Sequence, residues 1–485
     1  MVIVDGTRDI TGTEQESICV RYVNNNMLPQ EVFLGMYEAT DTTGEALCRI
    51  IGDVLLRFNL PLSSLRGQTY DGASSMSGQY TGCQALVKQK NPLALYVHCG
   101  AHCINLVMET VATCNPLLRD AIQWVHEVGT MMSQSGKFKA AFVRNVSELH
   151  ENIRMLRPLC PTRWVVRVSA IRSLLAQYDA VLETLEEFGT NKSSTADAKT
   201  RASGLFDRFT KGNTLLLLSL ALPIFELLEN LCTALQGRQS SVCGMLNAVK
   251  QTTDGLKTVR SDERFVALFD AAQQEAQKLN IEDITLPRQS RLPRKLNIGY
   301  SGQHVFENAA DYFKPIYCSI IDTAVHSLAI RFDQQSFTAV SALEDCILNG
   351  KLTDVIQSYP ELDVSRLAIQ LPMFRSSYKY TTVGEAVAVL QSSEAEVQQL
   401  FSEVIKVLRC LLVLPATSCE AERTFSSLRR LKTYLRSTMT QKRLNSVAVC
   451  NVHQKVLMSV SIEDIMTDFI SLHSGRQRTF GAAAR

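Results

Sequence analysis

The stretch Leu414-Pro-Ala-Thr-Ser-Cys-Glu-Ala-Glu-Arg-Thr-Phe-Ser426 predicts the beginning of a helix near the C-terminus. Thr417 is placed to cap this helix, and Glu420, three residues later, would complete a capping box. An apolar stripe at helical spacing follows, formed by Ala421, Phe425, Leu428 and Leu435. Glu422 lies beside that stripe rather than opposite it. Its carboxylate is therefore expected at the edge of a core, facing a cleft.

A run of basic residues begins in the same stretch. Between Arg423 and Arg443 there are seven Lys or Arg and no Asp or Glu. Such a run predicts either a solvated face or a face that binds phosphates. On the second reading, weak and sequence-independent DNA contacts are expected from Arg429, Arg430, Lys432, Arg436, Lys442 and Arg443.

Composition indicates a large globular protein. The chain has 485 residues, of which 46% are apolar and 20% charged, and its net charge of +2 means that any nucleic-acid surface must be a local patch. Its 14 Cys show no Cys-x-x-Cys pair, which favours free thiols in a reducing compartment. No apolar run reaches membrane-spanning length: Leu215–Leu222 has the size of a buried helix and is closed by Pro223. We therefore expect no membrane partner.

The N-terminal 165 residues alternate between strand and helix patterns. Strands are expected at 1–4, 17–23, 31–37, 65–71 and 93–98. Helices are expected at 46–58, 77–90, 104–111 and 117–132. This order of three strands, helix, strand, helix, strand, helix is typical of an RNase H-like fold. From 166 to 404 the pattern becomes mainly helical, with a polar loop at 191–202 and a basic, acid-free loop at 286–303.

Three acids form a candidate metal site. Asp5 and Asp71 follow strand candidates, and Glu422 lies on the C-terminal helix. Phosphoryl transfer with two divalent metals requires carboxylates of this kind, and Mg²⁺ and Mn²⁺ prefer oxygen ligands. The competing interpretation is that each Asp is an ordinary turn or cap residue, as Asp71-Gly72 would suit.

Two further motifs could have either a functional or a structural role. Cys99 and His102 form a Cys-x-x-His pair, but structural zinc takes four ligands, so we expect no structural zinc here. Arg163-Trp164 places a cation beside one of two Trp residues. The Arg could hold a phosphate while the ring stacks on a base, or the Trp could anchor the helical part of the chain on the sheet.

Five motifs occur in the order found in hAT-superfamily transposases. They are Val4-Asp-Gly-Thr-Arg-Asp9 with Cys19-Val-Arg-Tyr-Val23, Gln68-Thr-Tyr-Asp-Gly-Ala-Ser-Ser-Met-Ser-Gly78, His98-Cys-Gly-Ala-His-Cys-Ile-Asn-Leu106, Pro161-Thr-Arg-Trp164, and the stretch from Leu414 that ends in Arg443-Leu-Asn445. Over nearly its whole length the chain resembles this family, and it is similar to the hAT-like region of zinc finger MYM-type proteins.

The resemblance implies an α/β fold with an RNase H-like core interrupted by a large, mainly helical insertion domain. It places the first part of the core at 1–165, the insertion at 166–404, the dimerisation region that completes the core at 405–472, and a polar tail at 473–485. It implies that Asp5, Asp71 and Glu422 form the acidic triad, with Asp9 and Glu420 as possible misassignments. The catalytic positions it implies are Asp5, Asp71, Glu422, Arg163, Trp164, Cys99 and His102.

Two functions are expected from these features. The first is a nuclear, hAT transposase-derived protein that forms a homodimer or higher oligomer through its C-terminal region. No Cys and His set with finger spacing occurs, so we expect a domesticated or truncated protein without its DNA-recognition finger. The second is a metal-dependent DNA strand-transferase or nuclease that uses Mg²⁺ or Mn²⁺. An apolar stripe suits packing on a partner subunit or in the chain's own core, and it consists of Leu444, Val447, Ala448, Val452 and Val456.

Overall fold

The structure is a computed structural model that describes residues 1–149, 155–156, 164–190, 195–237, 241–287, 306–333 and 336–481. The chain forms two compact units, one made of Met1–Cys99 with Thr338–Arg485 and the other of Gly100–Phe337. The second unit is helical, and it begins and ends earlier along the chain than the insertion expected at 166–404.

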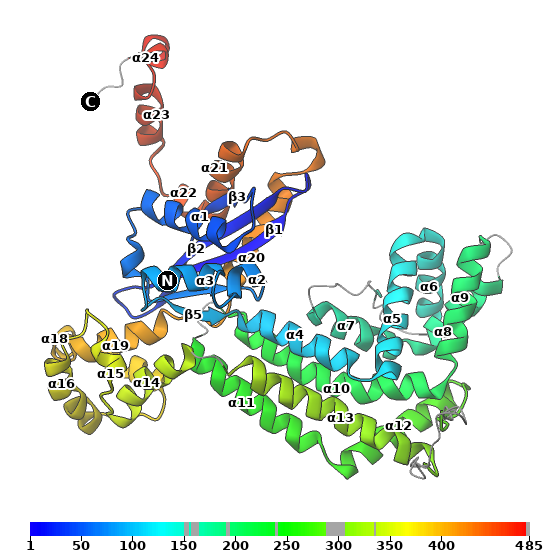
Figure 1. The fold of residues 1–485 in the computed structure, drawn as a ribbon. Helices are drawn as coiled ribbons and strands as arrows, with labels where there is room; N and C mark the ends of the chain where they lie inside the picture. The colour runs from blue at the N-terminus through cyan, green and yellow to red at the C-terminus, as the bar shows by residue number, and fades with distance from the viewer. Residues whose placement is uncertain are drawn as a thin grey trace. The chain divides into compact units, whose positions relative to one another are not determined.

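The described residues of the first unit contain a five-stranded mixed sheet with the order β3-β2-β1-β4-β5 (Figure 1). β1 and β2 are antiparallel, as are β2 and β3, whereas β4 runs parallel to β1 and to β5. The strands are β1 (Val2–Arg8), β2 (Glu14–Val23), β3 (Pro29–Glu38), β4 (Gly67–Tyr70) and β5 (Leu95–His98). Each strand expected from the sequence is therefore confirmed, although β1 and β2 extend further toward the turn that joins them.

A close approach of α21 (Gln441–Val452) fixes one position of β3. The side chain of Asn445 accepts a hydrogen bond from the Met36 N–H at 2.9 Å. A Cβ on Gly35 would lie 2.3 Å from the same Asn445 oxygen, so only glycine fits there. The C-terminal segment is thus fitted to the sheet by specific contacts as well as by apolar packing.

One face of the sheet is covered by α1 (Gly44–Arg57), α2 (Ser74–Ser77) and α3 (Cys83–Lys90). The single helix expected at 77–90 is wrong, because the chain forms two helices separated by a tight turn. In that turn a Cβ on Gly82 would lie 2.4 Å from the Gly78 nitrogen. The buried side chains on this face include Val2, Val4, Leu47, Ile51 and Tyr70.

The opposite face of the sheet is covered by α20 (Cys419–Leu431) and α21, which follow β1 by some four hundred residues. A hydrogen bond of 2.8 Å joins the hydroxyls of Ser17 and Thr424 across this interface. The shared core consists of Ile3, Cys19, Phe33, Met36, Ala421, Phe425, Leu428, Leu431, Leu444 and Ala448. The predicted return of the Glu422 helix to the sheet is therefore observed.

Two details of the predicted C-terminal helix are wrong. Its N-cap is Ser418 rather than the expected Thr417, and Ser418 makes no side-chain capping hydrogen bond. Leu435 is 78% exposed, because α20 ends at Leu431 and the chain then turns through the short 3₁₀ helix η3 (Tyr434–Arg436). Leu431 takes the buried position instead.

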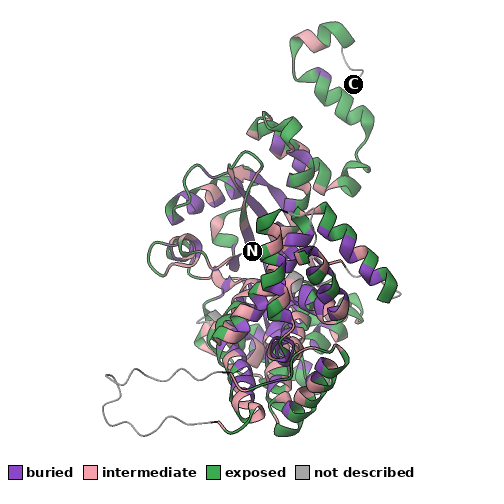
Figure 2. Cartoon of the chain, turned by 90° about the vertical axis from the view of Figure 1, so that its right-hand side faces the viewer, coloured by how far each residue is buried: buried purple, intermediate pink, exposed green. Residues whose placement is uncertain are grey.

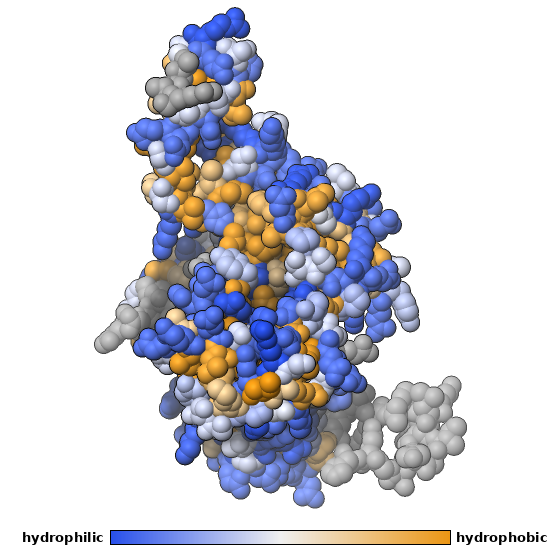
Figure 3. Space-filling model, turned by 90° about the vertical axis from the view of Figure 1, so that its left-hand side faces the viewer, coloured by the Kyte–Doolittle hydropathy of each residue, from blue (hydrophilic) through white to orange (hydrophobic). Residues whose placement is uncertain are grey.

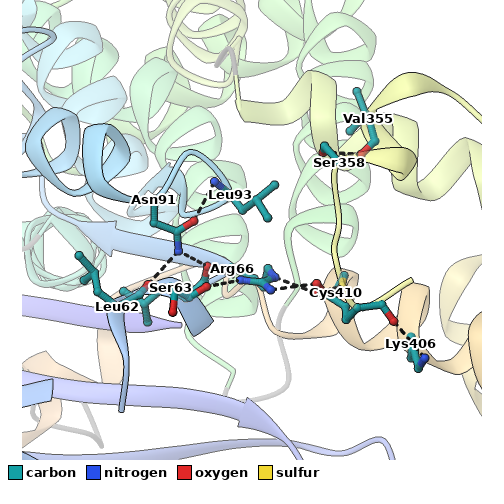
Figure 4. A network of polar contacts seen from close by, with 11 residues as sticks. Leu62, Ser63, Arg66, Asn91, Leu93, Val355, Ser358, Lys406 and Cys410 are labelled. Carbon is teal, nitrogen blue, oxygen red and sulfur yellow. Dashed lines mark hydrogen bonds and ion pairs between the residues drawn. The ribbon is translucent and has the colours of Figure 1, made fainter. Parts of the chain in front are cut away.

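A group of helices precedes α20 in the first unit, and polar contacts join it to the sheet. Arg66, just before β4, donates to both carboxylate oxygens of Glu361 at 2.7 and 2.8 Å. Lys406 and Cys410 also contact Glu361, and Arg66 donates to the Ser63 carbonyl (Figure 4). The helices are α14 (Ser336–Asn349), α15 (Asp354–Gln357), α16 (Val364–Ser377), α17 (Val383–Gln391), α18 (Ala395–Leu400) and α19 (Ser402–Leu412).

The second unit is built from long helices. They are α4 (Gly100–Thr113), α5 (Pro116–Gln134), α6 (Gly136–Leu149), α7 (Trp164–Leu175), α8 (Tyr178–Thr190), α9 (Ala196–Phe209), α10 (Gly212–Leu235), α11 (Val242–Val259), α12 (Asp262–Lys278) and α13 (Ala309–Arg331). The polar loop expected at 191–202 is wrong from residue 196 onward, where α9 begins after its cap Thr195. Most of the basic loop expected at 286–303 lies outside the described residues.

Pro223 lies inside α10 and does not end it, contrary to the prediction. Within the described ranges, α10 is the helix that is long and apolar enough to cross a membrane. Most of its apolar window is buried inside the structure, and the core helix of a soluble protein gives the same result.

The chain ends in α22 (Gln454–Leu457), α23 (Ile462–Ser471) and α24 (Ser474–Phe480), so part of the expected polar tail is helical. Figure 2 shows that these helices are mostly exposed.

Candidate functional site

Two of the predicted acids lie on neighbouring strands. β1 and β4 run parallel with Val2 opposite Gln68 and Ile3 opposite Thr69. Extending this register by two residues places Asp5 beside Asp71, the first residue after β4. Asp5 was expected at the end of a strand. It lies inside β1 instead, because β2 pairs with β1 as far as Arg8.

The third predicted acid, Glu422, belongs to the first turn of α20. Side chains alternate along a strand, so Asp5 faces the same side of the sheet as Ile3, which packs against α20. Asp5 pairs with Ser17, whose hydroxyl bonds Thr424, two residues after Glu422. The fold therefore directs Asp5 toward the helix that carries Glu422.

Electrostatics link the three acids. Burial raises the pKa of Asp5 well above its usual value, and the charges of Glu422, Asp71 and Glu16 raise it further. A hydrogen bond from the Gly6 backbone opposes this shift. A carboxylate whose charge raises the pKa of a neighbouring carboxyl lies within reach of it. Glu422, Asp71 and a fourth carboxyl, that of Glu16, therefore lie near enough to Asp5 for their charges to raise its pKa.

Glu16 is the acid that the sequence analysis missed. It is 4% exposed and pairs with Gly6 across β1 and β2. Burial raises its pKa to about 7, with further contributions from the charges of Glu14 and Asp71. Glu16 stands among polar residues at the start of β2, and a sequence pattern of this kind predicts an exposed side chain. The available signal was the glycine one residue after Asp5, which leaves room beside a cross-strand neighbour.

The two alternative acids are already engaged. Asp9 accepts hydrogen bonds from Thr11 and Thr13 in the β1–β2 turn and forms a 2.5 Å ion pair with Lys432. Burial would raise the pKa of Asp9, but these bonds lower it overall. Glu420 pairs with Arg423 at 2.5 Å. Asp9 and Glu420 therefore stabilise a turn and a helix end.

The donor atoms at this site suit a hard divalent cation, but their spacing does not form a ligand shell. Within the described residues, no three His, Cys, Asp or Glu side chains are grouped so that they could hold one metal ion. All four acids offer carboxylate oxygens, the ligands that Mg²⁺ and Mn²⁺ prefer. One of these oxygens, Glu16 Oε2, is buried without a hydrogen-bond partner in this part of the chain.

The Cys-x-x-His motif is divided between the two units. Cys99 is buried at the end of β5, and its sulfur accepts a hydrogen bond of 3.2 Å from the Ser418 N–H. Cys99 thus contacts the residue that precedes α20. His102 lies in α4, in the helical unit. Arg163 lies outside the described residues, and only the backbone of Trp164 is described, at the start of α7.

Five of the six predicted DNA-contacting cations are exposed, and the sixth is not. Lys432 is 7% exposed and is paired with Asp9, so the prediction that it contacts DNA is wrong for this structure. The other five form no ion pair within the described chain. They lie at the end of α20, in η3 and at the start of α21, and we call them the basic surface: Arg429, Arg430, Arg436, Lys442 and Arg443.

The predicted apolar stripe of α21 packs inside the chain. Leu444 and Ala448 are fully buried against the sheet, and Val447 and Val452 pack against the same core. Of the two interpretations of this stripe, the intramolecular one therefore holds up to Val452. Val456, beyond the end of α21, is exposed.

Comparisons with known proteins confirm the resemblance to hAT-related proteins. Residues 1–82 match the ZMYM1/FAM200 RNase-like domain, and residues 389–456 match the hAT family C-terminal dimerisation region. The chain is 22% identical over 510 residues to the 52 kDa repressor of the inhibitor of the protein kinase from Homo sapiens, with 98% of this chain and 64% of the relative covered. The Mus musculus protein of that name is 22% identical over 509 residues with the same coverage. The chain thus spans slightly less than two thirds of these relatives.

Proposed function

We propose that this chain is a nuclear, hAT transposase-derived scaffold, domesticated from a transposase, that dimerises through its C-terminal region. The observation that carries the proposal is that the matched dimerisation region completes the core through α20 and α21 and leads into an exposed apolar segment. Similarity to a protein whose name describes a repressor supports a regulatory rather than a transposing role.

An RNase H-like core is part of this proposal. Its support is the strand order β3-β2-β1-β4-β5, with an antiparallel half and a parallel half, and the RNase-like match at 1–82. The positions of Asp5 in the central β1 and of Asp71 just after the adjacent β4 also support it.

The dimer contact we propose uses an apolar surface that follows α21. On α23, Ile462, Ile465, Met466 and Phe469 recur at helical spacing and are exposed. Figure 3 shows hydrophobic residues among hydrophilic ones at this C-terminal end. Contiguous apolar surface of this kind in a soluble chain marks an interaction site. We call it the C-terminal apolar surface, and it consists of Val456, Leu457, Met458, Val460, Ile462, Ile465, Met466, Phe469 and Leu472.

A second copy of this chain is the partner that we propose for this surface. The surface begins at the end of the matched dimerisation region, so the two are continuous. α23 carries Glu463, Asp464 and Asp468, while α24 carries Arg476 and Arg478. In a two-fold symmetric pair each copy can set its acidic helix near the basic helix of the other.

Light scattering on the full chain at micromolar concentration tests the dimer. The wild type is expected to have the mass of at least two chains. The double variant Ile465→Glu with Phe469→Glu is expected to have the mass of one. Ile369→Glu is the matched control, because Ile369 is 71% exposed on α16 and should leave the mass unchanged. A wild-type monomer, or a double variant that still dimerises, would contradict the proposal.

The basic surface favours weak DNA binding as an accompanying property. Five exposed cations without ion-pair partners in the described chain can each neutralise a phosphate and release a counterion. Affinity is then expected to be sequence-independent and to fall with salt. Arg429→Glu with Arg430→Glu should weaken binding, whereas Lys88→Glu with Lys90→Glu, the same charge change on exposed residues of α3, should affect it much less. Equal effects of both pairs would remove the basic surface as the binding site.

The alternative function is a metal-dependent DNA strand-transferase or nuclease. Asp5, Asp71 and Glu422 would hold Mg²⁺ or Mn²⁺, which when bound stabilises charge on the attacking and leaving oxygens of a phosphodiester. The observation that favours it is the placement of Asp5 beside Asp71 and on the face of the sheet that α20 covers, where the charges of Asp71 and Glu422 raise the pKa of Asp5. Strand cleavage of plasmid DNA that is lost in Asp71→Asn would support it. If the wild type cleaves no DNA with either metal, the nuclease alternative is contradicted and only the scaffold function remains.

A further inference from the structure

Two large apolar side chains are exposed next to each other in the loop that joins α20 to α21. Tyr434 is 76% exposed and Leu435 is 78% exposed, and both belong to the short 3₁₀ helix η3. A single exposed apolar side chain is ordinary on a protein surface, so neither residue alone indicates a function. The pair differs because it lies among cations, so that an aromatic ring and positive charge share one surface.

Both ends of this loop are anchored on the sheet. Before the loop, Leu431 is buried in the core that α20 shares with the sheet. After the loop, Gln441 exchanges hydrogen bonds of 3.0 and 3.1 Å with Gln15 on β2 and donates another, of 2.9 Å, to the Met36 carbonyl. Figure 1 shows the loop beside the turn between β1 and β2. The backbone that carries Tyr434 is therefore held in place, and less conformational entropy is lost when a ligand binds.

The basic surface flanks the exposed pair on both sides. Two of its cations precede the pair in the last turn of α20, one follows within η3, and two lie in the first turn of α21. Cations in the first turn of a helix oppose its dipole, so Lys442 and Arg443 do not stabilise α21. The chain from Arg423 to Arg443 contains no Asp or Glu that would weaken the positive potential. A polyanion is therefore the ligand that this charge favours.

The exposed ring decides which polyanion fits the basic surface. In duplex DNA each base is stacked on its neighbours, and its flat faces are out of reach of a protein side chain. In a single strand the bases can stack on an aromatic ring while Lys and Arg follow the phosphates. Every base offers a flat π-face, so such binding tolerates any sequence. The combination of Tyr434 with the five cations thus suits a single strand better than a duplex.

We propose that the basic surface binds single-stranded DNA, with phosphates on its cations and a base stacked on Tyr434. This inference rests on the DNA binding proposed above and adds the form of DNA that the surface takes. Leu435 contributes apolar area beside the ring. The stacked base gives the single strand a contact that the duplex cannot make, which compensates for the lower charge density of the single strand.

Fluorescence anisotropy of the full chain with a labelled oligothymidine strand, and with a labelled duplex of the same length, tests this inference. Tyr434→Ala is expected to weaken binding of the single strand about tenfold and to change duplex affinity by about twofold at most. Tyr434→Phe keeps the ring and should bind the single strand within about twofold of the wild type. Tyr22→Ala is the matched control, because Tyr22 is 50% exposed at the end of β2 far from the β1–β2 turn, and it should change neither affinity.

Salt dependence separates stacking from charge. Stacking releases no counterion, so Tyr434→Ala should leave the slope of log affinity against log salt concentration unchanged. The double variant Arg429→Glu with Arg430→Glu should reduce that slope and weaken binding of both forms of DNA. Urea unfolding of Tyr434→Ala should match that of the wild type, because the side chain is exposed.

Equal losses for the single strand and the duplex in Tyr434→Ala would contradict stacking, as would a loss in Tyr434→Phe as large as that in Tyr434→Ala. Wild-type affinity of Tyr434→Ala for the single strand, together with weaker binding of both forms by the double Arg variant, would overturn this inference and leave the basic surface as a DNA-binding site. If the wild type binds neither form, both this inference and the DNA binding proposed above are wrong.

Discussion

Replacing Lys432 with Met is expected to destabilise the protein and to leave its DNA affinity unchanged. Lys432 and Asp9 form a 2.5 Å ion pair in which the side chains are 7% and 0% exposed. Removing one partner of a buried pair costs about 3–5 kcal/mol, because the other charge is left buried and uncompensated. Asp9 would still accept bonds from Thr11 and Thr13, so we expect a loss near the lower end, about 3 kcal/mol.

The free energy of unfolding in urea measures this cost, and fluorescence anisotropy at low salt measures DNA affinity. Asp9→Asn alone should also destabilise the protein. The double variant Asp9→Asn with Lys432→Met should lose less than the sum of the two single variants, because neither charge is then left alone. Lys88→Met, at an exposed site, is the control and should change stability by about 0.5 kcal/mol or less. A loss of unfolding free energy below about 1 kcal/mol for Lys432→Met, combined with weaker DNA binding, would refute the structural role. Lys432 would then be a DNA-contacting residue like those of the basic surface.

Three other predictions concern the same core and acidic site. The pKa of Glu16 is about 7 in the folded chain against an ordinary value of 4.5, so its contribution to stability is full below pH 4.5 and is lost as the pH rises through 7. The loss is about 3 kcal/mol at most, and a plot of unfolding free energy against pH should flatten in Glu16→Gln. Leu444→Ala, which opens a cavity beneath α21, should cost about 2–5 kcal/mol in urea unfolding. Millimolar Mg²⁺ or Mn²⁺ should raise the melting temperature of the wild type and not that of Asp71→Asn.

The strands and the helix α20 could be predicted from the sequence because their signals are local, whereas the return of α20 to the sheet was expected from the family resemblance. Alternation of apolar residues marks β2, a short apolar run marks β3, and Ala421, Phe425 and Leu428 recur at helical spacing. The division of the helix at 77–90 was missed, because the contact between Gly78 and Gly82 is a close approach of two backbone segments. The spacing of apolar residues does not predict a backbone contact of this kind.

The acidic site could be predicted only in part, because part of it depends on contacts between distant segments. Asp5, Asp71 and Glu422 came from motifs and from their positions near strands and on a helix. Glu16 became visible only once the register placed it opposite Gly6. Lys432 was predicted to be a surface cation because a basic run gives no sign that one member meets Asp9, 423 positions earlier in the chain.

The packing of α20 and α21 on the sheet has a consequence for synthesis of the protein on the ribosome. Ser17 and Thr424, which touch across this interface, are 407 positions apart. At about 5–20 residues per second, roughly 20–80 s separate the emergence of β2 from that of α20. During that time the apolar face formed by Ile3, Phe33 and Met36 has no intramolecular cover from α20 and α21. A chain that terminates early would keep this face exposed and lack Glu422, so it would be both a chaperone substrate and inert as an acidic site.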